Sequence, residues 1–236
     1  MIDKLKKLLK MDKEIPKEES LVTREPIDTV TVTDTVTETV IEEVLDELID
    51  DTFLETSSEA VGFENREAQW DTYRVMSQYF SADDSILDFG CGRGDFRSFF
   101  ISEFETDLDY TGIDFNAQLI DAGKKLNPET NLIHEDWKSY QGEADWCINI
   151  GSHDVRYDAN AVMTDMEYLK NTIKKMYTSC NSGLAIMLAS DTLQQDEGII
   201  TWSAPDILKF ALQEFGTASI DHSYSDAIFT LIIYKN

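Results

Sequence analysis

Two hydrophobic patterns alternate along the chain from about residue 62 onward. Short apolar runs bounded by turn residues are typical of buried strands, and apolar residues three or four positions apart are typical of amphipathic helices. Helical patterns separate five short runs, which predict strands at residues 86–89, 110–114, 131–135, 146–150 and 184–189. Strands that alternate with helices predict a parallel sheet with helices on both faces.

The C-terminal part breaks this alternation. Two further apolar runs, at residues 217–224 and 228–234, are separated only by residues 225–227. A link this short joins antiparallel strands, because a parallel crossover needs a much longer connection. We therefore expect an α/β fold with a Rossmann-like, doubly wound sheet of seven strands, mostly parallel and ending in an antiparallel hairpin.

Helix boundaries are marked at several places. A helix over residues 65–80 is expected before the first strand, and Phe96 opens a phenylalanine-rich helix after it. The helix before the hairpin begins at Ser203, where a capping-box spacing and the early Pro205 mark an N-terminus. A longer helix before the fifth strand is marked by the apolar positions Val162, Met166, Leu169, Ile173 and Met176.

Residues 1–61 differ from the rest and are expected to form an acidic, low-complexity and amphipathic extension of a domain at 62–236. Lysines separate the apolar residues of the segment 2–10, and threonines occupy every odd position from 29 to 39. From residue 40 an apolar stripe of helical period faces an acidic surface. Such a stripe must be buried, so self-docking, self-association or a protein partner is expected at residues 40–55.

The composition narrows the classes of partner. The net charge of −26 repels phosphate backbones and anionic membranes, which argues against nucleic acid as a partner. Cys91, Cys147 and Cys180 lie too far apart for a metal-ligand pattern or a disulfide framework. No apolar run reaches transmembrane length, and the N-terminus lacks a signal-peptide pattern. The sequence thus predicts a cytoplasmic protein with no membrane span and no metal site.

One glycine-rich segment points to a cofactor. The apolar run at 86–89 is followed by Gly90, Gly92 and Gly94, and then by a helical pattern. Glycines at alternate positions let the main chain turn sharply and approach a ligand closely. A dinucleotide fingerprint would read G-x-G-x-x-G, but Asp95 stands in place of its third glycine, where a carboxylate would repel a pyrophosphate. A glycine turn with no ligand, in any doubly wound sheet, is the alternative interpretation.

An acidic residue at position 88 followed by the glycines at 90, 92 and 94 resembles the first motif of class I S-adenosylmethionine (SAM) methyltransferases. The resemblance covers residues 62–236 and includes the terminal hairpin. It implies SAM as the cofactor and methyl transfer to an unidentified acceptor, with a small molecule or a protein favoured over DNA.

The resemblance assigns roles at the carboxyl ends of the strands, where open α/β sheets bind ligands. Asp88 and the glycines would lie near the methionine amino group. Asp114 ends the second strand and matches the family's ribose-binding acid, since a carboxylate accepts two hydrogen bonds. As an alternative, Asp114 could cap the following helix, although Asn116 is equally able to do so.

Further candidates follow the third and fourth strands. Asp136 and Trp137 match the family's adenine-binding pair, and Glu135 could exchange roles with Asp136. Arg66, Tyr73 and Arg74 on the helix at 65–80 are candidates for the methionine carboxylate by position and charge. The expected cofactor-binding set is Asp88, Gly90, Cys91, Gly92, Gly94, Asp114, Phe115, Asp136, Trp137, Asn149 and Gly151.

The segment after the fourth strand would line the site of methyl transfer. His153 is the candidate general base, because its ordinary pKa is near neutrality and Asp154 is adjacent, and both are assigned to catalysis. A polar turn after a strand explains the same residues without any chemistry. DNA amino-methyltransferases carry Asn or Asp followed by Pro-Pro-aromatic at this point, whereas residues 149–152 read Asn-Ile-Gly-Ser, which argues against DNA bases as acceptors.

Two other functions use the same fold. A methyltransferase-like module could serve as a structural or interaction protein through its acidic N-terminal segment. The Y-x-G-I-D segment at 110–114 and the F-T-x-x-x-Y-K ending at 229–235 resemble small methyltransferase-domain proteins of tailed phages, so a phage-infected bacterium and virion association are also considered. Aminopropyl transfer from decarboxylated SAM would need a more acidic amine pocket than the sequence indicates.

Overall fold

A single seven-stranded sheet organises the chain. The computed structural model describes residues 51–154, 164–192 and 199–235, and the predictions for segments 2–10 and 29–39 and for most of 40–55 lie outside these residues. The strand order is β3-β2-β1-β4-β5-β7-β6. The pairs β1–β2, β1–β4, β2–β3 and β4–β5 are parallel, and β7 is antiparallel to both β5 and β6. The expected α/β fold with a C-terminal antiparallel hairpin is therefore confirmed.

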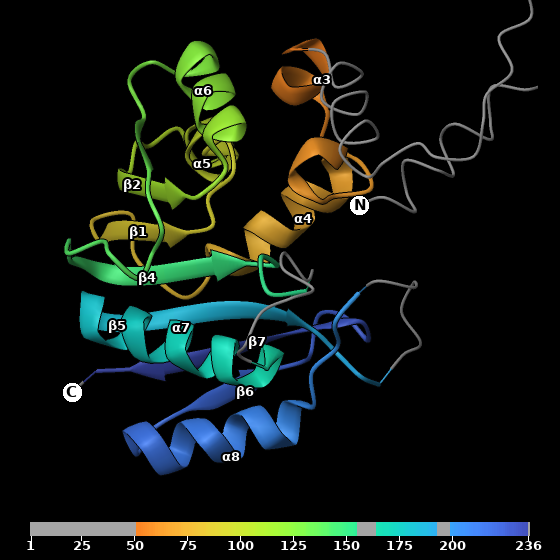
Figure 1. Cartoon of the computed structure of the whole chain (residues 1–236), viewed down its shortest axis with the longest axis vertical. Helices are drawn as coiled ribbons and strands as arrows, with labels where there is room; N and C mark the ends of the chain where they lie inside the picture. Colours follow the sequence, from red (N-terminus) through yellow and green to blue (C-terminus); the bar gives the residue numbers. More distant parts are fainter. Residues whose placement is uncertain (1–50, 155–163, 193–198, 236) are drawn as a thin grey trace, which may run out of the picture. The chain divides into compact units, whose positions relative to one another are not determined.

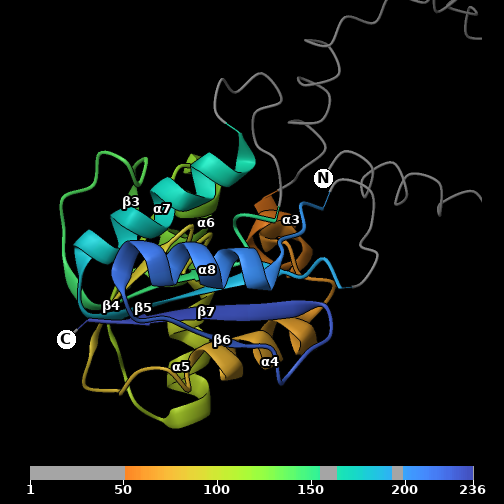
Figure 2. The same cartoon turned by 90° about the horizontal axis from the view of Figure 1, so that it is seen from below.

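Helices cover both faces of the sheet. Figure 2 shows α7 and α8 on one face and α4 and α5 on the other, and Figure 1 shows the arrowheads of β1, β4 and β5 pointing the same way while that of β7 points back. The strands are β1 (Ser85–Phe89), β2 (Asp109–Asp114), β3 (Asn131–His134), β4 (Ala144–Ile150), β5 (Cys180–Ala189), β6 (Ser219–Asp221) and β7 (Ile228–Tyr234). The helices are α3 (Asp51–Thr56), the 3-10 turn η1 (Glu59–Val61), α4 (Arg66–Met76), α5 (Asp95–Phe104), α6 (Ala117–Leu126), α7 (Asp165–Ser179) and α8 (Ala204–Phe215).

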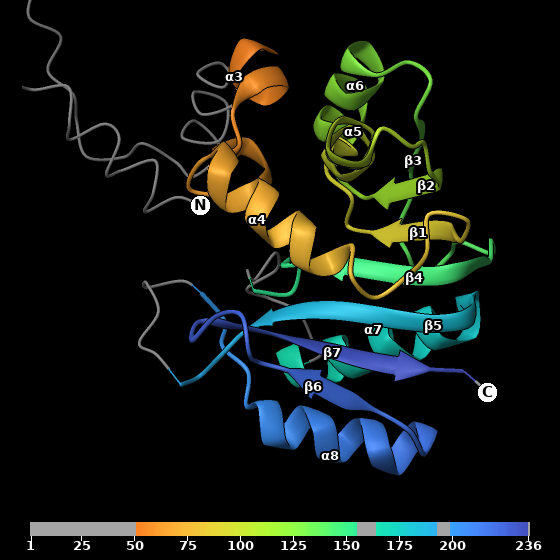
Figure 3. The ribbon, with the colours of Figure 1, turned by 180° about the vertical axis from the view of Figure 1, so that it is seen from behind.

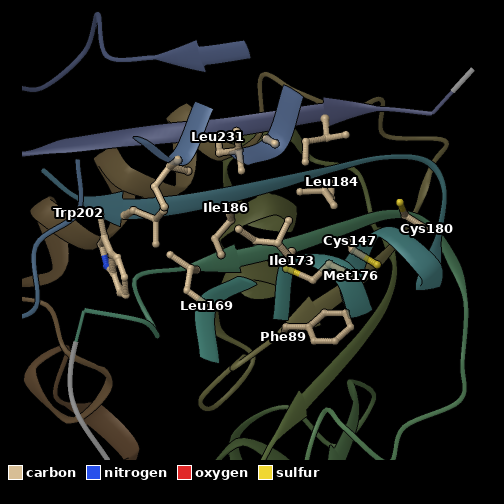
Figure 4. Close-up of a cluster of buried hydrophobic side chains, with 14 of the residues drawn as sticks. Phe89, Cys147, Leu169, Ile173, Met176, Cys180, Leu184, Ile186, Trp202 and Leu231 are labelled. Atoms are coloured by element: carbon tan, nitrogen blue, oxygen red, sulfur yellow. The ribbon is translucent and has the colours of Figure 1, made fainter. Parts of the chain in front are cut away.

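Strand side chains alternate between two buried clusters, as period-two geometry requires. On β5, Leu184, Ile186 and Leu188 belong to the cluster under α7 and α8, and Ala185 and Met187 belong to the cluster under α4, α5 and α6. Figure 4 shows the first of these clusters, with side chains from β1, β4, β5 and β7 meeting those of α7. Burial on both faces explains why the sequence of the central strands reads as continuous apolar runs.

Local signals fix the helix starts. Asn65, Asn116, Thr164 and Ser203 each accept a main-chain N–H of the following turn, and Thr164 forms a reciprocal capping box with Glu167. The start of α8 at Ser203 confirms that prediction. The long helix begins at Asp165, because Thr164 is extended and caps it, and the predicted position Val162 lies outside the described residues.

The hairpin strand β6 is shorter than predicted. It covers residues 219–221 instead of 217–224. The Asp221 carboxylate accepts the main-chain N–H and the hydroxyl of Ser223 at 3.0 and 2.7 Å, which turns the chain away from the sheet.

The described unit runs from Asp51 to the C-terminus. It includes α3 and η1, at positions that the sequence analysis assigned to the extension ending at residue 61. Figures 1 and 3 both show α3 on the side to which the arrowheads of β1 and β2 point. Among the described residues, no helix has the length and hydrophobicity needed to span a membrane.

The helix α6 approaches the turn after β1 through Gly123. A Cβ at this position would lie 2.4 Å from the Arg93 carbonyl oxygen and 2.6 Å from Leu132 Cδ1. Alanine normally favours a helix interior over glycine, but main-chain atoms cannot yield cheaply to a clash. We expect Gly123→Ala to lower the free energy of unfolding by about 1–3 kcal/mol, measured by urea denaturation. The exposed neighbour provides the control: Lys124→Ala should change it by less than about 0.5 kcal/mol.

Candidate functional site

The turn after β1 is a glycine loop, residues 90–94. Gly90, Gly92 and Gly94 have φ values of 77°, 58° and 73°, which side chains disfavour. The main-chain N–H groups of Gly90 and Cys91 donate to the Ile113 carbonyl at 2.8 and 3.1 Å, so the loop is tied to the end of β2. The Cys91 side chain packs under Gly112, and burial raises the pKa of its thiol. Because its side chain is buried, Cys91 could contact a ligand only through its main chain.

Asp114 connects the end of β2 to the same loop. Its Oδ2 accepts the Gly92 N–H at 2.8 Å, and its Oδ1 accepts the Asn116 N–H at 2.8 Å. Asn116 caps α6 with its own side chain, so the alternative that Asp114 is the helix cap does not hold. Burial raises the pKa of Asp114, and the hydrogen bonds from Asn116 and Gly92 oppose that rise.

Asp88 is a buried carboxylate with one oxygen unsatisfied. Tyr110 donates its hydroxyl to Asp88 Oδ2 at 2.7 Å, and Oδ1 accepts no hydrogen bond from the described residues. Burial raises the pKa of Asp88 to about 7, opposed by the Tyr110 hydroxyl and reinforced by the charge of Asp114. A buried acceptor without a partner is costly, so this oxygen is suited to a donor or a cation supplied from outside.

The end of β4 is in contact with the glycine loop. Asn149 Nδ2 donates to the Phe89 carbonyl and to Ser152 Oγ, and Asn149 Oδ1 accepts no hydrogen bond from the described residues. A Cβ on Gly90 would lie 2.8 Å from Ser152 Cβ. Gly151 has φ 70°, which turns the chain at this point. Asp88 and Asn149 thus place two buried, unsatisfied acceptors at the carboxyl ends of neighbouring strands.

Asp95 occupies the first turn of α5 and is saturated with donors. Its Oδ2 accepts hydrogen bonds from Arg93 Nη2 at 2.6 Å and from Gln69 Nε2 at 3.0 Å. A phosphate at this helix N-terminus would face a carboxylate, which agrees with the sequence argument against a pyrophosphate. Sequence reasoning missed Arg93, Gln69 and Tyr110, because only their tertiary contacts distinguish them from ordinary polar residues.

The adenine candidates lie in different environments. Asp136 is exposed and accepts the Lys138 N–H at 2.9 Å, and its carboxylate lies 3.7 Å from the Lys138 ammonium. Trp137 packs against the cluster under α7, where its indole N–H donates to the Tyr168 hydroxyl at 2.8 Å. Phe115, directly after Asp114, is 52% exposed. The more accessible aromatic ring at this edge therefore belongs to Phe115.

The two catalytic candidates also differ. His153 is 5% exposed and lies with its ring 5.4 Å from that of Tyr168, and burial lowers its pKa to about 4. Asp154 accepts the Ala189 N–H at 2.9 Å, and burial raises its pKa to about 7. Its Oδ2 would be 3.6 Å from a Cβ at Gly151. Asp154 therefore combines a near-neutral pKa with a position beside the turn after β4.

The expected cations of α4 have other partners, although Arg66 lines the same cavity as Arg93 of the glycine loop. Arg74 pairs with Asp71 at 2.6 Å and with Glu103 at 2.8 Å, and Arg66 lies over the Trp70 ring. Tyr73 is buried and its hydroxyl accepts from Gln69. Within residues 51–154, 164–192 and 199–235, no three His, Cys, Asp or Glu side chains are placed to hold a metal ion.

Comparison with solved structures identifies the fold class. The chain matches the plantazolicin methyltransferase BpumL with bound SAH (S-adenosylhomocysteine) at a TM-score of 0.57 and 14% identity, over 85% of this chain and 100% of that one. It matches magnesium protoporphyrin IX methyltransferase from Synechocystis PCC 6803, also with SAH, at a TM-score of 0.54 and 13% identity, over 79% and 100%. N-methyltransferase NodS from Bradyrhizobium japonicum WM9 matches at 0.54 and 14%, over 78% and 98%.

At these identities the likeness shows the fold. No family model and no curated protein matches the sequence. The sheet order, the antiparallel β7 and these neighbours together show that the chain has the fold of class I SAM-dependent methyltransferases. The resemblance expected from the glycine motif is confirmed at this level.

Proposed function

We propose that the protein is a SAM-dependent methyltransferase. The observation that carries the proposal is the glycine loop at the carboxyl edge of this sheet, where acceptors and carboxylates gather. A dinucleotide would bring a pyrophosphate to Asp95, whereas SAM carries no phosphate and has an ammonium and a sulfonium. The neighbouring structures, which hold SAH, support this choice of cofactor.

The residues present fit this cofactor. Asp88 Oδ1 and Asn149 Oδ1 are unsatisfied acceptors for an ammonium, and Gly90 and Gly92 allow main-chain approach. Asp114, held by Gly92 and Asn116, would accept the ribose hydroxyls in the role that the resemblance gives it. For the adenine we propose Phe115 as the stacking ring, with Asp136 and Trp137 as the neighbouring edge; Cys91, Gly94 and Gly151 complete the set through main chain and packing.

When bound, SAM supplies a methyl group on an activated sulfur, so the protein's task is to align the acceptor and to exclude water. Acceptors that arrive protonated need a base. We propose Asp154 for that role, because a carboxyl with a pKa near 7 is well matched to neutral pH. His153, whose burial keeps it neutral, would position the turn beside it.

The acceptor is proposed by class only. The neighbours include enzymes named for a porphyrin and for plantazolicin, and one belongs to an RNA repair complex. For this chain we favour a small molecule or a protein, because the net charge of −26 opposes binding to nucleic acid. We propose a cytoplasmic location, with the segment 40–55 as a candidate for partner binding or self-association.

Binding of SAH tests the proposal, with Asp114→Ala as the informative variant. The substitution removes both the ribose acceptor and the hydrogen bond from Gly92, so we expect at least about tenfold weaker SAH binding, measured by calorimetry. Asp121→Ala, at an exposed position on α6, is the matched control and should bind like the unmodified chain. Failure of the full-length protein to bind SAH would contradict the proposal and favour a structural or virion-associated module.

A further inference from the structure

A buried arginine stands inside the glycine loop. Arg93 lies between Gly92 and Gly94 and is 3% exposed. Its Nη1 donates to the Leu54 carbonyl at 2.6 Å, and its Nη2 pairs with Asp95 Oδ2 at 2.6 Å. A guanidinium is stable in a buried position only when its donors are paired. One of its three hydrogen bonds therefore goes to a residue 39 positions earlier in the chain, and the other two, from Nε and Nη2, go to Asp95.

Residues 53–61, which we call the strap, meet the glycine loop and the helices around it at three further points. Ser58 Oγ donates to Gln69 Oε1 at 3.1 Å, and Gln69 in turn bonds to Asp95. Glu55 pairs with Lys125 of α6 at 3.4 Å. Val61 rests on the loop, since a Cβ at Gly92 would lie 3.0 Å from Val61 Cγ1.

The strap packs against α6 without contributing a fully buried residue to a core. None of residues 53–61 is fully buried. A cavity of about 330 Å³ lies among the strap, α4, α5 and the end of α6, lined by Glu55, Ser58, Trp70, Arg93 and Leu126 among others. Segments with few buried apolar contacts open at a lower free energy than the rest of a domain. We therefore expect the polar bonds of the strap to contribute to its order.

We propose that Arg93 is a positioning residue that couples the order of the strap to the retention of the cofactor by the glycine loop. The inference rests on the proposed function. The loop conformation that aims Arg93 at Leu54 is the one that presents Gly92 and Gly94, because these residues adjoin it. A ligand that fixes this loop conformation favours the strap in contact with the loop. By linkage, a strap in contact with the loop raises the affinity for the ligand.

Hydrogen exchange and SAH dissociation on the full chain test the coupling, with Arg93→Met as the variant. In the unmodified protein, SAH should slow amide exchange across residues 53–61. In Arg93→Met, we expect these amides to exchange about tenfold faster without SAH, and SAH to dissociate about five to ten times faster. Arg97→Met is the matched control, because Arg97 pairs with Asp107 and Thr130 and should leave both quantities unchanged.

Two more variants separate this role from a general loss of structure. Ser58→Ala leaves the loop sequence intact and should change both quantities in the same direction, by about twofold. Arg93→Lys keeps the charge and should recover part of the loss. If the Arg93→Met strap exchanges faster while SAH dissociates at the unmodified rate, the coupling is absent. If the unmodified chain binds no SAH, the proposed function fails and the inference with it, an outcome distinct from binding with unchanged dissociation.

Discussion

Replacement of Gly90 by alanine is expected to weaken SAH binding by about 100-fold in a protein that still folds. Gly90 has φ 77°, and an added Cβ would lie 2.8 Å from Ser152 Cβ and 2.9 Å from Ser152 Oγ. Ser152 is tied to Asn149, which is bonded to the carbonyl next to Gly90. The clash must therefore displace either the glycine loop or the end of β4, and a displacement of this size should weaken SAH binding by about 100-fold.

Gly216 provides the matched control. It has φ 83°, and a Cβ added there would meet no atom of the described residues within 4 Å, so alanine brings the strain of a positive φ without the clash. The positive φ should cost each variant about 1–2 kcal/mol of unfolding free energy, and Gly216→Ala should keep its SAH affinity. Calorimetry and urea denaturation of the two proteins measure the difference. Equal SAH affinities in Gly90→Ala and the unmodified chain would show that SAH does not bind at this loop.

Replacement of Asp88 by asparagine is expected to stabilise the ligand-free protein at neutral pH and to weaken SAH binding. The folded protein raises the pKa of Asp88 to about 7 because the carboxyl is buried, whereas in the unfolded chain the group ionises near its ordinary pKa of 3.8. A carboxyl whose pKa is raised in the folded state lowers the free energy of unfolding of the protein as pH increases between these two values. The loss is complete above about pH 7 and amounts to at most about 4 kcal/mol.

The pH dependence of SAH affinity has the opposite sign to that of stability. An ammonium beside Asp88 favours the ionised carboxyl, so SAH affinity of the unmodified protein should rise as pH increases through about 7. In Asp88→Asn this rise should disappear, and affinity at pH 8 should fall by about tenfold or more. Asp154 titrates in the same range, so the comparison is between variant and unmodified protein at each pH. Thermal unfolding and calorimetry from about pH 5 to about pH 8 give both curves, and an unchanged pH dependence in Asp88→Asn would contradict the role of Asp88.

Strand and helix positions followed from the sequence wherever burial is continuous. The alternation of apolar runs placed β1, β2 and β4 to within two residues, because both faces of the central strands are buried, whereas β5 begins four residues before the predicted start, where two positions are exposed. The strand at the edge of the sheet was harder to predict. β6 is short because the Asp221 side chain competes for the main chain at the point where apolar residues still continue. Local polar bonds of this kind leave little trace in hydrophobic periodicity.

The glycine loop and the order of the secondary structure elements could be predicted from the amino-acid pattern alone, because alternate glycines, short apolar runs and a short final link have few physical solutions. The same pattern placed acidic residues at the ends of β1 and β2. The partners of these residues and of Arg93 emerged only from the folded chain: Tyr110 donates to Asp88, Gly92 donates to Asp114, and Arg93 donates to Leu54. Those contacts join residues 22 to 39 positions apart, and they, rather than residue type, fix burial and hence pKa and charge pairing.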